Sequence, residues 1–371
     1  APGYLGVAHT AIRETLPNRL VLTPGTQVRA HSSYSETDYN TFMRADATRQ
    51  GFARGMLTVD AKTLDIFLAK PTDTDTNRLG FTFDGQVRLD AAPGTDGFGG
   101  TVNVRGLGEV LAAGQTAATG LAGASVQADE LSKLHAPRLV LNGGIAVKEY
   151  GQRGRLATID GDGSLVVRSG ARLSAGDIVL ASSPGFVGEQ QIVIEEGASL
   201  STLGQKASGF DSSAGYVFTG TSVLALSNGW LNLQLGASSP DVPYSVGIHV
   251  GQCVTASCSG TTQLVSEGTL AIATNGALTL ADNVSYGTRN LSLAVAAVNL
   301  GEDAAIATAG ANGRLPLGLA LNQARLDRLL AGNTAIGAPA LETLIFNARD
   351  AVNIFGAVKL DASGLDRLVF G

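Results

Sequence analysis

The sequence predicts an all-β fold in which short strands repeat and stack on one another. First, a strand–corner–strand unit within 163–203 occurs twice, 27 residues apart. Second, glycine makes up 48 of the 371 residues, which suits frequent tight turns. Third, apolar and polar residues alternate in each unit, so successive side chains point to opposite faces of a strand. The recurring positions are Leu165, Val167, Gly170, Ala171, Leu173 and Ser174, followed by Ile192, Ile194, Gly197, Ala198, Leu200 and Ser201. Such a repeat indicates one unit stacked on the next, and it favours a solenoid over a β-sandwich.

Composition and charge exclude several classes of protein. The net charge is −6, which argues against a nucleic-acid-binding chain, because such a chain carries a basic stripe. With 44% hydrophobic and 16% charged residues, the chain is too apolar for intrinsic disorder. The longest apolar stretch, Leu291–Leu300, is too short to span a bilayer. The opening shows no signal peptide and the final LDRLVFG shows no capping pattern, so we expect an excised piece of a longer protein.

The only two cysteines lie close together in the sequence. Cys253 and Cys258 are separated by four residues, in a loop rich in Gly, Ser and Thr without a nearby metal-ligand partner. The favoured interpretation is a structural disulfide in an oxidising compartment. The alternative is a pair of free thiols in a reducing cytosol.

The first domain, 1–125, is expected to contain short strands joined by long polar turns. We predict a strand, a Pro-Gly turn and a second strand over 20–31, and alternating strands over 56–70. The segment 81–91 contains Asp84-Gly85 between two alternating runs, which predicts a hairpin or a corner.

The second domain, 126–371, is expected to be a continuous repeat. Asp129 is predicted to cap one or two helical turns that end before Pro137. The strand–corner–strand unit is predicted to return three more times, beginning at Leu224, Leu270 and Val352.

Two insertions interrupt this predicted repeat. The first, 236–262, contains two prolines and the cysteine pair. The second, 319–333, has helical spacing of its apolar residues and ends at Gly332-Asn333, a helix stop signal. We predict one short helix there.

From about residue 125 onward, the order of motifs resembles the filamentous haemagglutinin-like exoproteins of Gram-negative two-partner secretion systems. The segments that carry this resemblance are ADELSKLHAPRLVLNGG (128–144), GSLVVRSGARLSAGDIVLAS (163–182), LNQARLDRLLAG (321–332) and LIFNARDAVNIFGAVKLDASG (344–364). The resemblance implies a right-handed parallel β-helix, exported through an outer-membrane two-partner-secretion transporter. It implies display at the cell surface or secretion, with a role in adhesion, biofilm formation or contact-dependent competition. It implies no catalytic residues in this region.

The sequence shows no motif typical of catalysis. It lacks a Walker-type loop, His-Glu-x-x-His and Gly-x-Ser-x-Gly. Asp160 and Asp162 resemble the start of a calcium loop, but no Glu follows at EF-hand spacing, so a turn is favoured. Glu195 and Glu196 precede a glycine corner and are interpreted as a solvated turn rather than a glycosidase pair. We therefore expect no enzyme activity, no cofactor and no metal.

Recognition is predicted where the repeat breaks. Tyr34, Tyr39 and Phe42 lie in an aromatic and polar loop and are candidate ligand-binding residues, because exposed rings stack on sugars or anchor protein contacts. The alternative is a loop that packs its own aromatic side chains.

The expected function is that of a structural and adhesive β-helix segment of a large secreted or cell-surface bacterial exoprotein. Its expected partners are a host or bacterial cell-surface receptor or glycan. The alternative is a receptor- or glycan-binding module of a contact-dependent growth inhibition protein. A polysaccharide-degrading β-helix enzyme is a third hypothesis.

Overall fold

The computed structural model describes most of the chain and divides it into two compact units, Ala1–Phe42 and Met43–Gly371. The described residues are 2–3, 19–20, 22–31, 37–69, 80–118, 120–151, 154–183, 190–205, 215–219, 222–235, 246–255 and 257–371. The domain boundary expected near residue 125 lies inside the second unit. It falls within strand β6 (Ala124–Gln127), which pairs with β5 (Leu107–Leu111).

The first unit contains short elements. They are the antiparallel pair β1 (Pro2–Gly3) and β2 (Arg19–Leu20), helix α1 (Gly25–His31) and the beginning of helix α2 (Tyr39–Gln50). The second strand predicted within 20–31 is wrong, because residues 25–31 are helical. The Pro24 carbonyl accepts hydrogen bonds from the backbone N–H groups of Gln27 and Val28. Proline is favoured at the start of a helix as well as in turns, so Pro-Gly did not distinguish the two.

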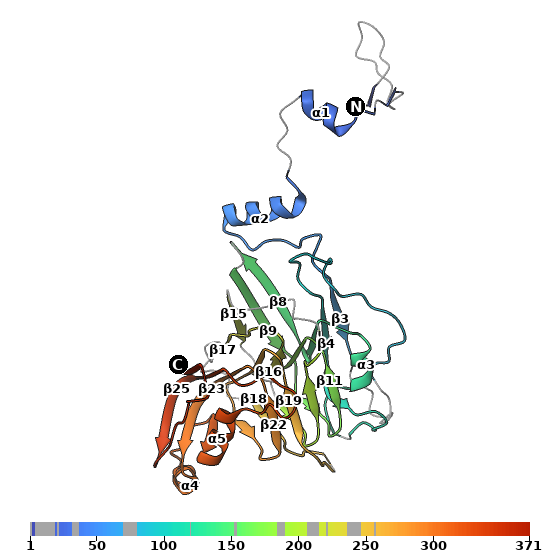
Figure 1. Cartoon of the computed structure of the whole chain (residues 1–371). Coiled ribbons are helices and arrows are strands. Elements are labelled where there is room, and N and C mark those ends of the chain that lie inside the picture. Colours follow the sequence, from blue (N-terminus) through green and yellow to red (C-terminus); the bar gives the residue numbers. More distant parts are fainter. Residues whose placement is uncertain are drawn as a thin grey trace. The chain divides into compact units, whose positions relative to one another are not determined.

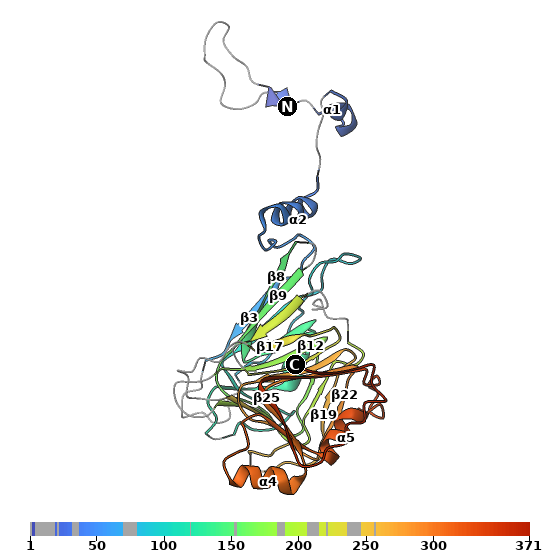
Figure 2. The same cartoon turned by 90° about the vertical axis from the view of Figure 1, so that its left-hand side faces the viewer.

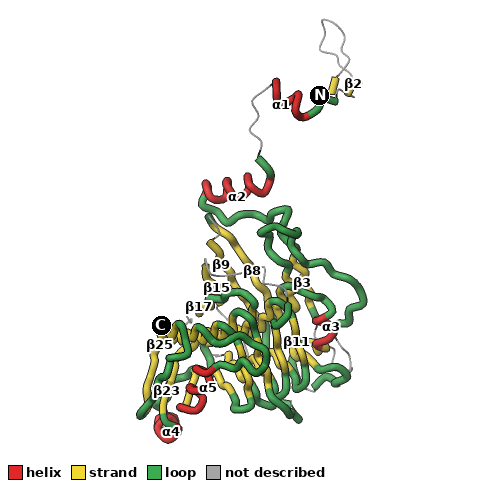
Figure 3. Tube along the Cα trace, in the orientation of Figure 1, coloured by secondary structure: helices red, strands yellow, loops and turns green. Residues whose placement is uncertain are grey.

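The second unit is mostly β-strand, and its strands can be described as three walls, of which walls A and C belong to one sheet and wall B is a separate sheet (Figures 1 and 3). Wall A comprises, in order, β6, β5, β10 (Leu165–Val167), β13 (Gln190–Ile194), β18 (Val246–Val250), β21 (Leu278–Leu280) and β24 (Leu319–Asn322). Wall B comprises β11 (Arg172–Ser174), β14 (Ser199–Ser201), β19 (Thr262–Val265) and β22 (Val284–Gly287). Neighbouring strands run parallel throughout walls A and B.

Wall C is the longest of the three. It comprises β3 (Thr63–Phe67), β4 (Thr101–Arg105), β7 (Arg138–Leu141), β12 (Asp177–Ser182), β16 (Ser222–Ser227), β20 (Thr269–Thr274), β23 (Asn290–Gly301), β25 (Thr343–Phe355) and β26 (Arg367–Phe370). Its strands run parallel except β16, which is antiparallel to both of its neighbours. The described fold is thus mostly β with parallel-rich sheets, which confirms the predicted all-β class.

The 27-residue repeat is paired residue by residue. Leu165 of β10 lies opposite Ile192 of β13, and Leu173 of β11 lies opposite Leu200 of β14. This register places the equivalent apolar side chains of the two units directly beside one another. The unit identified in the sequence therefore corresponds to adjacent strands in walls A and B.

The later copies of the unit do not continue this pairing, so their predicted places in the stack are wrong. β16, which contains Leu224, and β20, which contains Leu270, both belong to wall C. The next strand of wall A is instead β18, which lies inside the predicted insertion 236–262. The same pattern, an alternating apolar strand followed by a glycine, occurs at every corner of such a core. The pattern therefore could not assign a strand to its wall.

The last predicted unit also differs from its expected burial. Val352 and Ile354 lie in β25 and are 41% and 61% exposed. β26 pairs only with residues 343–346 of β25, so it does not cover this part of the strand. Their apolar character does not place them in the core.

The three walls enclose one apolar core, and wall C has a second apolar layer on its outer face. Leu139 and Leu141 of β7 point into the main core, whereas Val140 between them belongs to the outer layer. The outer layer is covered by a second sheet of β17 (Leu233–Leu235), β15 (Gly215–Thr219), β9 (Gly154–Gly161) and β8 (Gly143–Tyr150), whose β8 and β9 lie side by side in Figure 1. Burial on both faces explains why several strands of wall C read as continuous apolar runs.

The described residues contain five helices, whereas the sequence predicted one or two helical turns before Pro137 and one short helix within 319–333. Besides α1 and α2 they are α3 (Ala128–Ser132), α4 (Asp303–Ala311) and α5 (Gln323–Ala331). The α3 N-cap is Gln127, not Asp129. The predicted helix is α5, but residues 319–322 before it form β24, so the insertion is shorter than expected.

α5 is fixed to the walls by a cap and a buried tyrosine. The Asn322 side chain accepts a hydrogen bond from the Arg325 N–H at 2.9 Å, which satisfies one free donor of the first turn. The Tyr286 hydroxyl, from β22, donates to the Leu329 carbonyl. Figure 2 shows α5 beside β19 and β22.

A buried ion-pair cluster joins residues 54–60 to the second sheet. The Arg54 guanidinium, whose side chain is 4% exposed, lies 2.7 Å from an Asp60 oxygen and 3.0 Å from a Glu149 oxygen. It also lies 4.2 Å from the centroid of the Phe98 ring. The backbone N–H groups of Leu57 and Phe98 donate to Asp60. One guanidinium therefore pairs with two carboxylates, and backbone N–H groups also donate to the oxygens of Asp60.

This cluster predicts sensitivity to acid. Burial acts to raise the pKa of Asp60, but hydrogen bonds from Arg54 and from two backbone amides outweigh it and hold the pKa below its usual range. Because the folded pKa is lowered, the stabilisation is complete above pH ~4 and is lost as the pH falls through the folded value. We expect Asp60→Asn to lower the free energy of unfolding by about 2–3 kcal/mol at pH 7. Between pH 5 and pH 2, the free energy of unfolding of the variant, measured with urea, should then fall less than that of the native chain.

The exposed variant Asp366→Asn is the control for this experiment, and it should follow the native pH curve. If native and Asp60→Asn curves run parallel from pH 5 to pH 2, Asp60 does not carry the acid sensitivity.

Candidate functional site

The cysteine pair lies where wall A connects to wall B. The two Sγ atoms of Cys253 and Cys258 are 2.09 Å apart, in the connection 252–261 between β18 and β19. The corresponding connections after β10 and β13 are short corners, with Gly170 and Gly197 at positive φ. Within the described residues, only 252–261 of the predicted insertion 236–262 departs from the wall pattern. Residues 236–245 of that prediction lie outside the described part.

A buried carboxylate anchors this disulfide loop, defined as residues 252–261. Oε1 of Glu195 accepts hydrogen bonds from the Val254 N–H at 3.2 Å, and from the N–H and hydroxyl of Thr255 at 2.8 and 2.6 Å. Its Oε2 accepts from Arg168 Nε at 3.2 Å and from the Ser169 N–H at 3.0 Å. Glu195 is 0% exposed, so its interpretation as a solvated turn is wrong.

Arg168 links Glu195 to a second buried carboxylate. Arg168 Nη1 lies 2.6 Å from Oε2 of Glu109, and Oε1 of Glu109 accepts hydrogen bonds from the Ser125 hydroxyl and the Ala118 N–H. One guanidinium thus compensates two buried carboxylates, and hydroxyl and backbone donors satisfy their remaining oxygens. The Glu109–Arg168–Glu195 cluster connects three neighbouring strands of wall A, from the middle of β5 to the ends of β10 and β13.

Glu195, Cys253 and Cys258 are close enough to suggest a metal site, since their ligand atoms lie within 4.8 Å of one another. Metal coordination requires thiolates, and here the two sulfurs are bonded to each other. Glu195 Oε1 already accepts three hydrogen bonds. In the disulfide form, this arrangement is structural.

The disulfide is expected to add modest stability. Its loop is short, so the constraint on the unfolded chain amounts to about 2 kcal/mol. We expect the double variant Cys253→Ser/Cys258→Ser to have a free energy of unfolding, measured with urea, that is lower by this amount. The m-value should be unchanged, because Glu195 still holds the loop. A loss of less than about 0.5 kcal/mol would contradict a stabilising role.

The carboxylates considered for calcium are engaged with an arginine. The Arg105 guanidinium lies 2.5 Å from an Asp160 oxygen and 3.1 Å from an Asp162 oxygen. The second oxygen of Asp162 accepts from the Gly106 N–H at 3.1 Å. The guanidinium occupies the place that a cation would take, which favours the turn interpretation.

The predicted aromatic loop is partly helical. Tyr34 lies outside the described residues. Tyr39 and Phe42 are each 53% exposed and belong to the first turn of α2, not to a loop. Asp38 precedes this turn and its Oδ1 accepts from the Thr41 N–H at 3.0 Å, as a helix cap does. Residues three apart in a helix lie on one side, so Tyr39 and Phe42 still form a small exposed aromatic pair.

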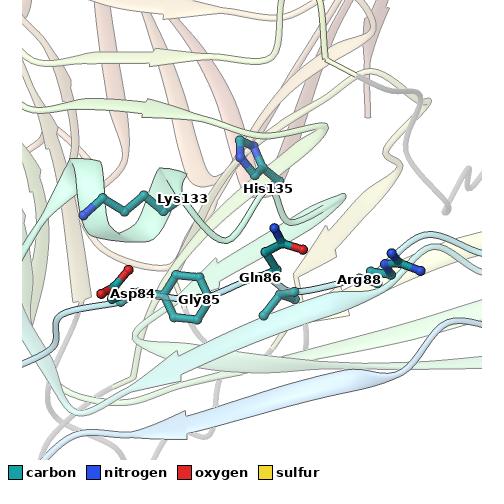
Figure 4. Close-up of a pocket in the computed structure, with 8 residues that line it drawn as sticks. Asp84, Gly85, Gln86, Arg88, Lys133 and His135 are labelled. Atoms are coloured by element: carbon teal, nitrogen blue, oxygen red, sulfur yellow. The ribbon is translucent and has the colours of Figure 1, made fainter.

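A groove beside α3 brings together polar side chains that the sequence did not single out (Figure 4). We call it the α3 groove; its volume is about 510 Å³, within the range of small-molecule sites. It is lined by Phe83, Asp84, Gly85, Gln86, Val87, Arg88, Lys133 and His135.

The alternation of the segment 81–89 builds one side of this groove. Phe81, Phe83 and Val87 pack against the main core, whereas Asp84, Gln86 and Arg88 are exposed. This alternation agrees with the sequence prediction; of the two predicted alternatives at Asp84-Gly85, the hairpin is wrong, and the chain instead bends at Gly85. Residues 81–91 belong to no described strand pair.

Glu130 of α3 joins the two sides of the groove. Its Oε1 lies 2.6 Å from Lys133 Nζ, and its Oε2 accepts from the Phe83 N–H at 2.7 Å. Hydrogen bonding from Lys133, and then from the Phe83 amide, lowers the pKa of Glu130. Glu130 stays ionised at neutral pH and acts as a positioning residue for both sides.

His135 projects from a backbone conformation that few side chains adopt. Its φ is +43°, and its N–H donates to the Ser132 carbonyl at the end of the turn after α3. Non-glycine residues in such conformations cluster at functional sites. In Figure 4, His135 and Gln86 approach one another across the groove, with Lys133 and Asp84 toward one end and Arg88 toward the other.

The groove differs in charge from the protein as a whole. Arg88 and Asp84 lie toward opposite ends of it and the Lys133 ammonium is paired with Glu130, so a chain of net charge −6 presents the Arg88 guanidinium at one end of the groove. Among the described residues that line the groove, Asp84 is the single carboxylate, and glycoside hydrolysis ordinarily requires two at a defined separation. The arrangement suits binding through hydrogen bonds and charge.

Sequence analysis missed the groove because its two sides are 45 or more residues apart, from Arg88 to Lys133. The alternating segment 81–89 was recognised, but nothing in it pointed to α3. A usable signal was the unpaired polar face of that segment, with three polar side chains at every second position.

Comparison with protein-family models, with curated proteins and with solved structures found no match. The resemblance to filamentous haemagglutinin-like exoproteins therefore stays a prediction. Within the described residues, every helix is too short or too polar to cross a membrane.

Proposed function

We propose that this chain is a structural and adhesive segment of a large secreted or cell-surface bacterial exoprotein, folded as a right-handed parallel β-helix. The observation that carries the proposal is the register of the repeat, in which Leu165 pairs with Ile192 and Leu173 with Leu200. Each strand–corner–strand unit pairs with the next along both walls, so backbone groups are satisfied between units. Such stacking makes an extended scaffold in which each unit contacts its neighbours.

An adhesive role is supported by where the surface departs from the repeat. The disulfide loop and the α3 groove both lie at such places, and a scaffold of paired strands holds them rigidly. The proposed partners are a host or bacterial cell-surface receptor or glycan, and an outer-membrane two-partner-secretion transporter during export. The disulfide fits an oxidising compartment outside the cytosol.

The β-helix part of the proposal can be tested by cross-linking exposed partners on wall B. Arg172 and Ser199 are paired across β11 and β14, and in-register neighbours lie at a distance that a disulfide can bridge. Arg172→Cys/Ser199→Cys should form a second disulfide in the folded chain. Arg172→Cys/Ser201→Cys, displaced by two residues, should not, and equal cross-linking of both would contradict the stacking.

The adhesive part can be tested with beads coated with the full chain. We expect them to attach to cultured epithelial cells or to Gram-negative bacteria more than beads coated with albumin do. Attachment to neither cell type would overturn the adhesive role while leaving the fold untouched.

A binding module is the second candidate function, and the α3 groove is the specific observation in its favour. In that case a single groove substitution should abolish attachment, whereas a surface spread along the scaffold would tolerate it.

A further inference from the structure

We propose that the α3 groove binds an anionic polysaccharide whose sugars carry carboxylates, with Arg88 as the anion-binding residue. This inference rests on the proposed surface function and names the ligand class of that surface.

The polar groups follow one another along the groove, which indicates an elongated ligand. Asp84 and Lys133 lie toward one end, Gln86 and His135 lie in the middle, and Arg88 lies toward the other end (Figure 4). Asp84, Gln86 and Arg88 come from every second position of one segment, which bends at Gly85. A chain molecule can contact all of these groups, whereas a single small anion can contact one end.

The side chains at the two ends differ in what they bind. Arg88 has no hydrogen-bond or ion-pair partner among the described residues, and a guanidinium presents a fork of N–H donors that matches a carboxylate. Asp84 accepts hydrogen bonds and repels anions, so it suits the hydroxyl groups of a sugar. The ligand should therefore combine carboxylates with hydroxyls, as an acidic sugar does.

The middle of the groove suits a sugar ring. Gln86 offers both a donor and an acceptor, His135 offers ring nitrogens, and the half-buried Phe83 ring provides an apolar wall. Glu130 fixes Phe83 and Lys133 in place through the two hydrogen bonds described above. Binding therefore requires little reorganisation of the groove.

The rest of the protein makes the Arg88 end of the groove selective. With a net charge of −6 for the chain, an anionic polymer is repelled from most of the surface and attracted to the Arg88 guanidinium. Because Arg88 is exposed, this attraction should weaken with added salt.

The test is titration of the full chain with polygalacturonate, with dextran sulfate and with neutral dextran, followed by calorimetry. We expect binding of polygalacturonate, no binding of dextran, and at least tenfold weaker binding when salt rises from 50 to 500 mM. Arg88→Ala should weaken binding at least tenfold, and Arg88→Lys less, because it keeps the charge and loses the fork. Arg314→Ala removes an exposed arginine that follows α4 and should bind as the native chain does.

Three results would overturn the inference. They are native-like binding by Arg88→Ala, equal loss in Arg314→Ala, and dextran sulfate binding as tight as polygalacturonate, which would indicate charge without carboxylate recognition. Equal urea-unfolding midpoints of the variants ensure that lost binding is not lost folding. If polygalacturonate fails to bind but coated beads still attach to cells, the ligand class is wrong and the proposed function stands.

Discussion

Replacing Arg168 by methionine should lower the free energy of unfolding by about 3–5 kcal/mol. Arg168 is the cation between Glu109 and Glu195, whose side chains are 1% and 0% exposed. Methionine fills a similar volume but leaves two carboxylates buried without a counter-charge. Removing one partner of a buried ion pair is far more destabilising than removing the whole group, because the remaining charge stays desolvated.

Companion variants separate charge from packing in this experiment. Arg168→Lys keeps the charge, but one ammonium cannot reproduce the contacts of a guanidinium with two carboxylates, so an intermediate loss is expected. The triple variant Glu109→Gln/Arg168→Met/Glu195→Gln removes all three charges and should recover part of the stability. Arg314→Met, at an exposed site, should change the free energy by less than about 0.5 kcal/mol.

Urea unfolding at pH 7 measures all four variants. A loss below about 1 kcal/mol for Arg168→Met would show that the carboxylates are compensated by their backbone and hydroxyl donors alone. A triple variant as unstable as Arg168→Met would show that packing, rather than unpaired charge, is responsible.

Sequence reasoning succeeded where the apolar core determines the structure. The pairing of Leu165 with Ile192 could be predicted because both residues must point inward and each precedes a glycine that turns the chain. The helix at 323–331 was likewise predictable, since Leu326, Leu329 and Leu330 form one buried face.

Sequence reasoning failed where local signals are shared by different structures. Alternation before a glycine occurs in walls A and C alike, so Leu224 and Leu270 were assigned to the wrong wall. Helix α4 was missed because its alanine-rich sequence has no apolar stripe that would indicate a helix. In agreement with this, only Ala309 of its residues is buried.

The candidate site depends on contacts between distant residues, which patterns of single segments cannot reveal. Glu195 and Thr255 are 60 residues apart, and Phe83 and Glu130 are 47 apart. The polar face of 81–89 was visible as an alternation, but its partner could be identified only once α3 was placed.

The corner glycines provide the second large effect. Gly170 and Gly197 occupy equivalent corners with φ of 78° and 86°, where any other residue costs about 1–2 kcal/mol. A Cβ at 170 would meet Ala112 Cβ at 3.5 Å, an ordinary contact, whereas a Cβ at 197 would lie 2.1 Å from the Ser259 carbonyl oxygen. We expect Gly170→Ala to lower the free energy of unfolding by about 1–2 kcal/mol. Gly197→Ala should lower it by about 3–5 kcal/mol, because at residue 197 overpacking adds to the backbone strain.

The disulfide loop explains the difference between these matched variants, and a double-mutant cycle tests that explanation. In the Cys253→Ser/Cys258→Ser background Glu195 still holds Val254 and Thr255, but the Ser259 end of the loop is no longer tied to Cys253 and can move away from residue 197. The loss from Gly197→Ala should therefore fall toward that from Gly170→Ala. The loss from Gly170→Ala itself should be unchanged, since a Cβ at residue 170 meets Ala112 and no atom of the loop. Equal losses for Gly197→Ala in both backgrounds would mean that the corner, not the loop, sets the cost. With the expected coupling, Gly197 serves both to turn the repeat and to leave room for the loop, so the scaffold and the feature that interrupts it are specified by one residue.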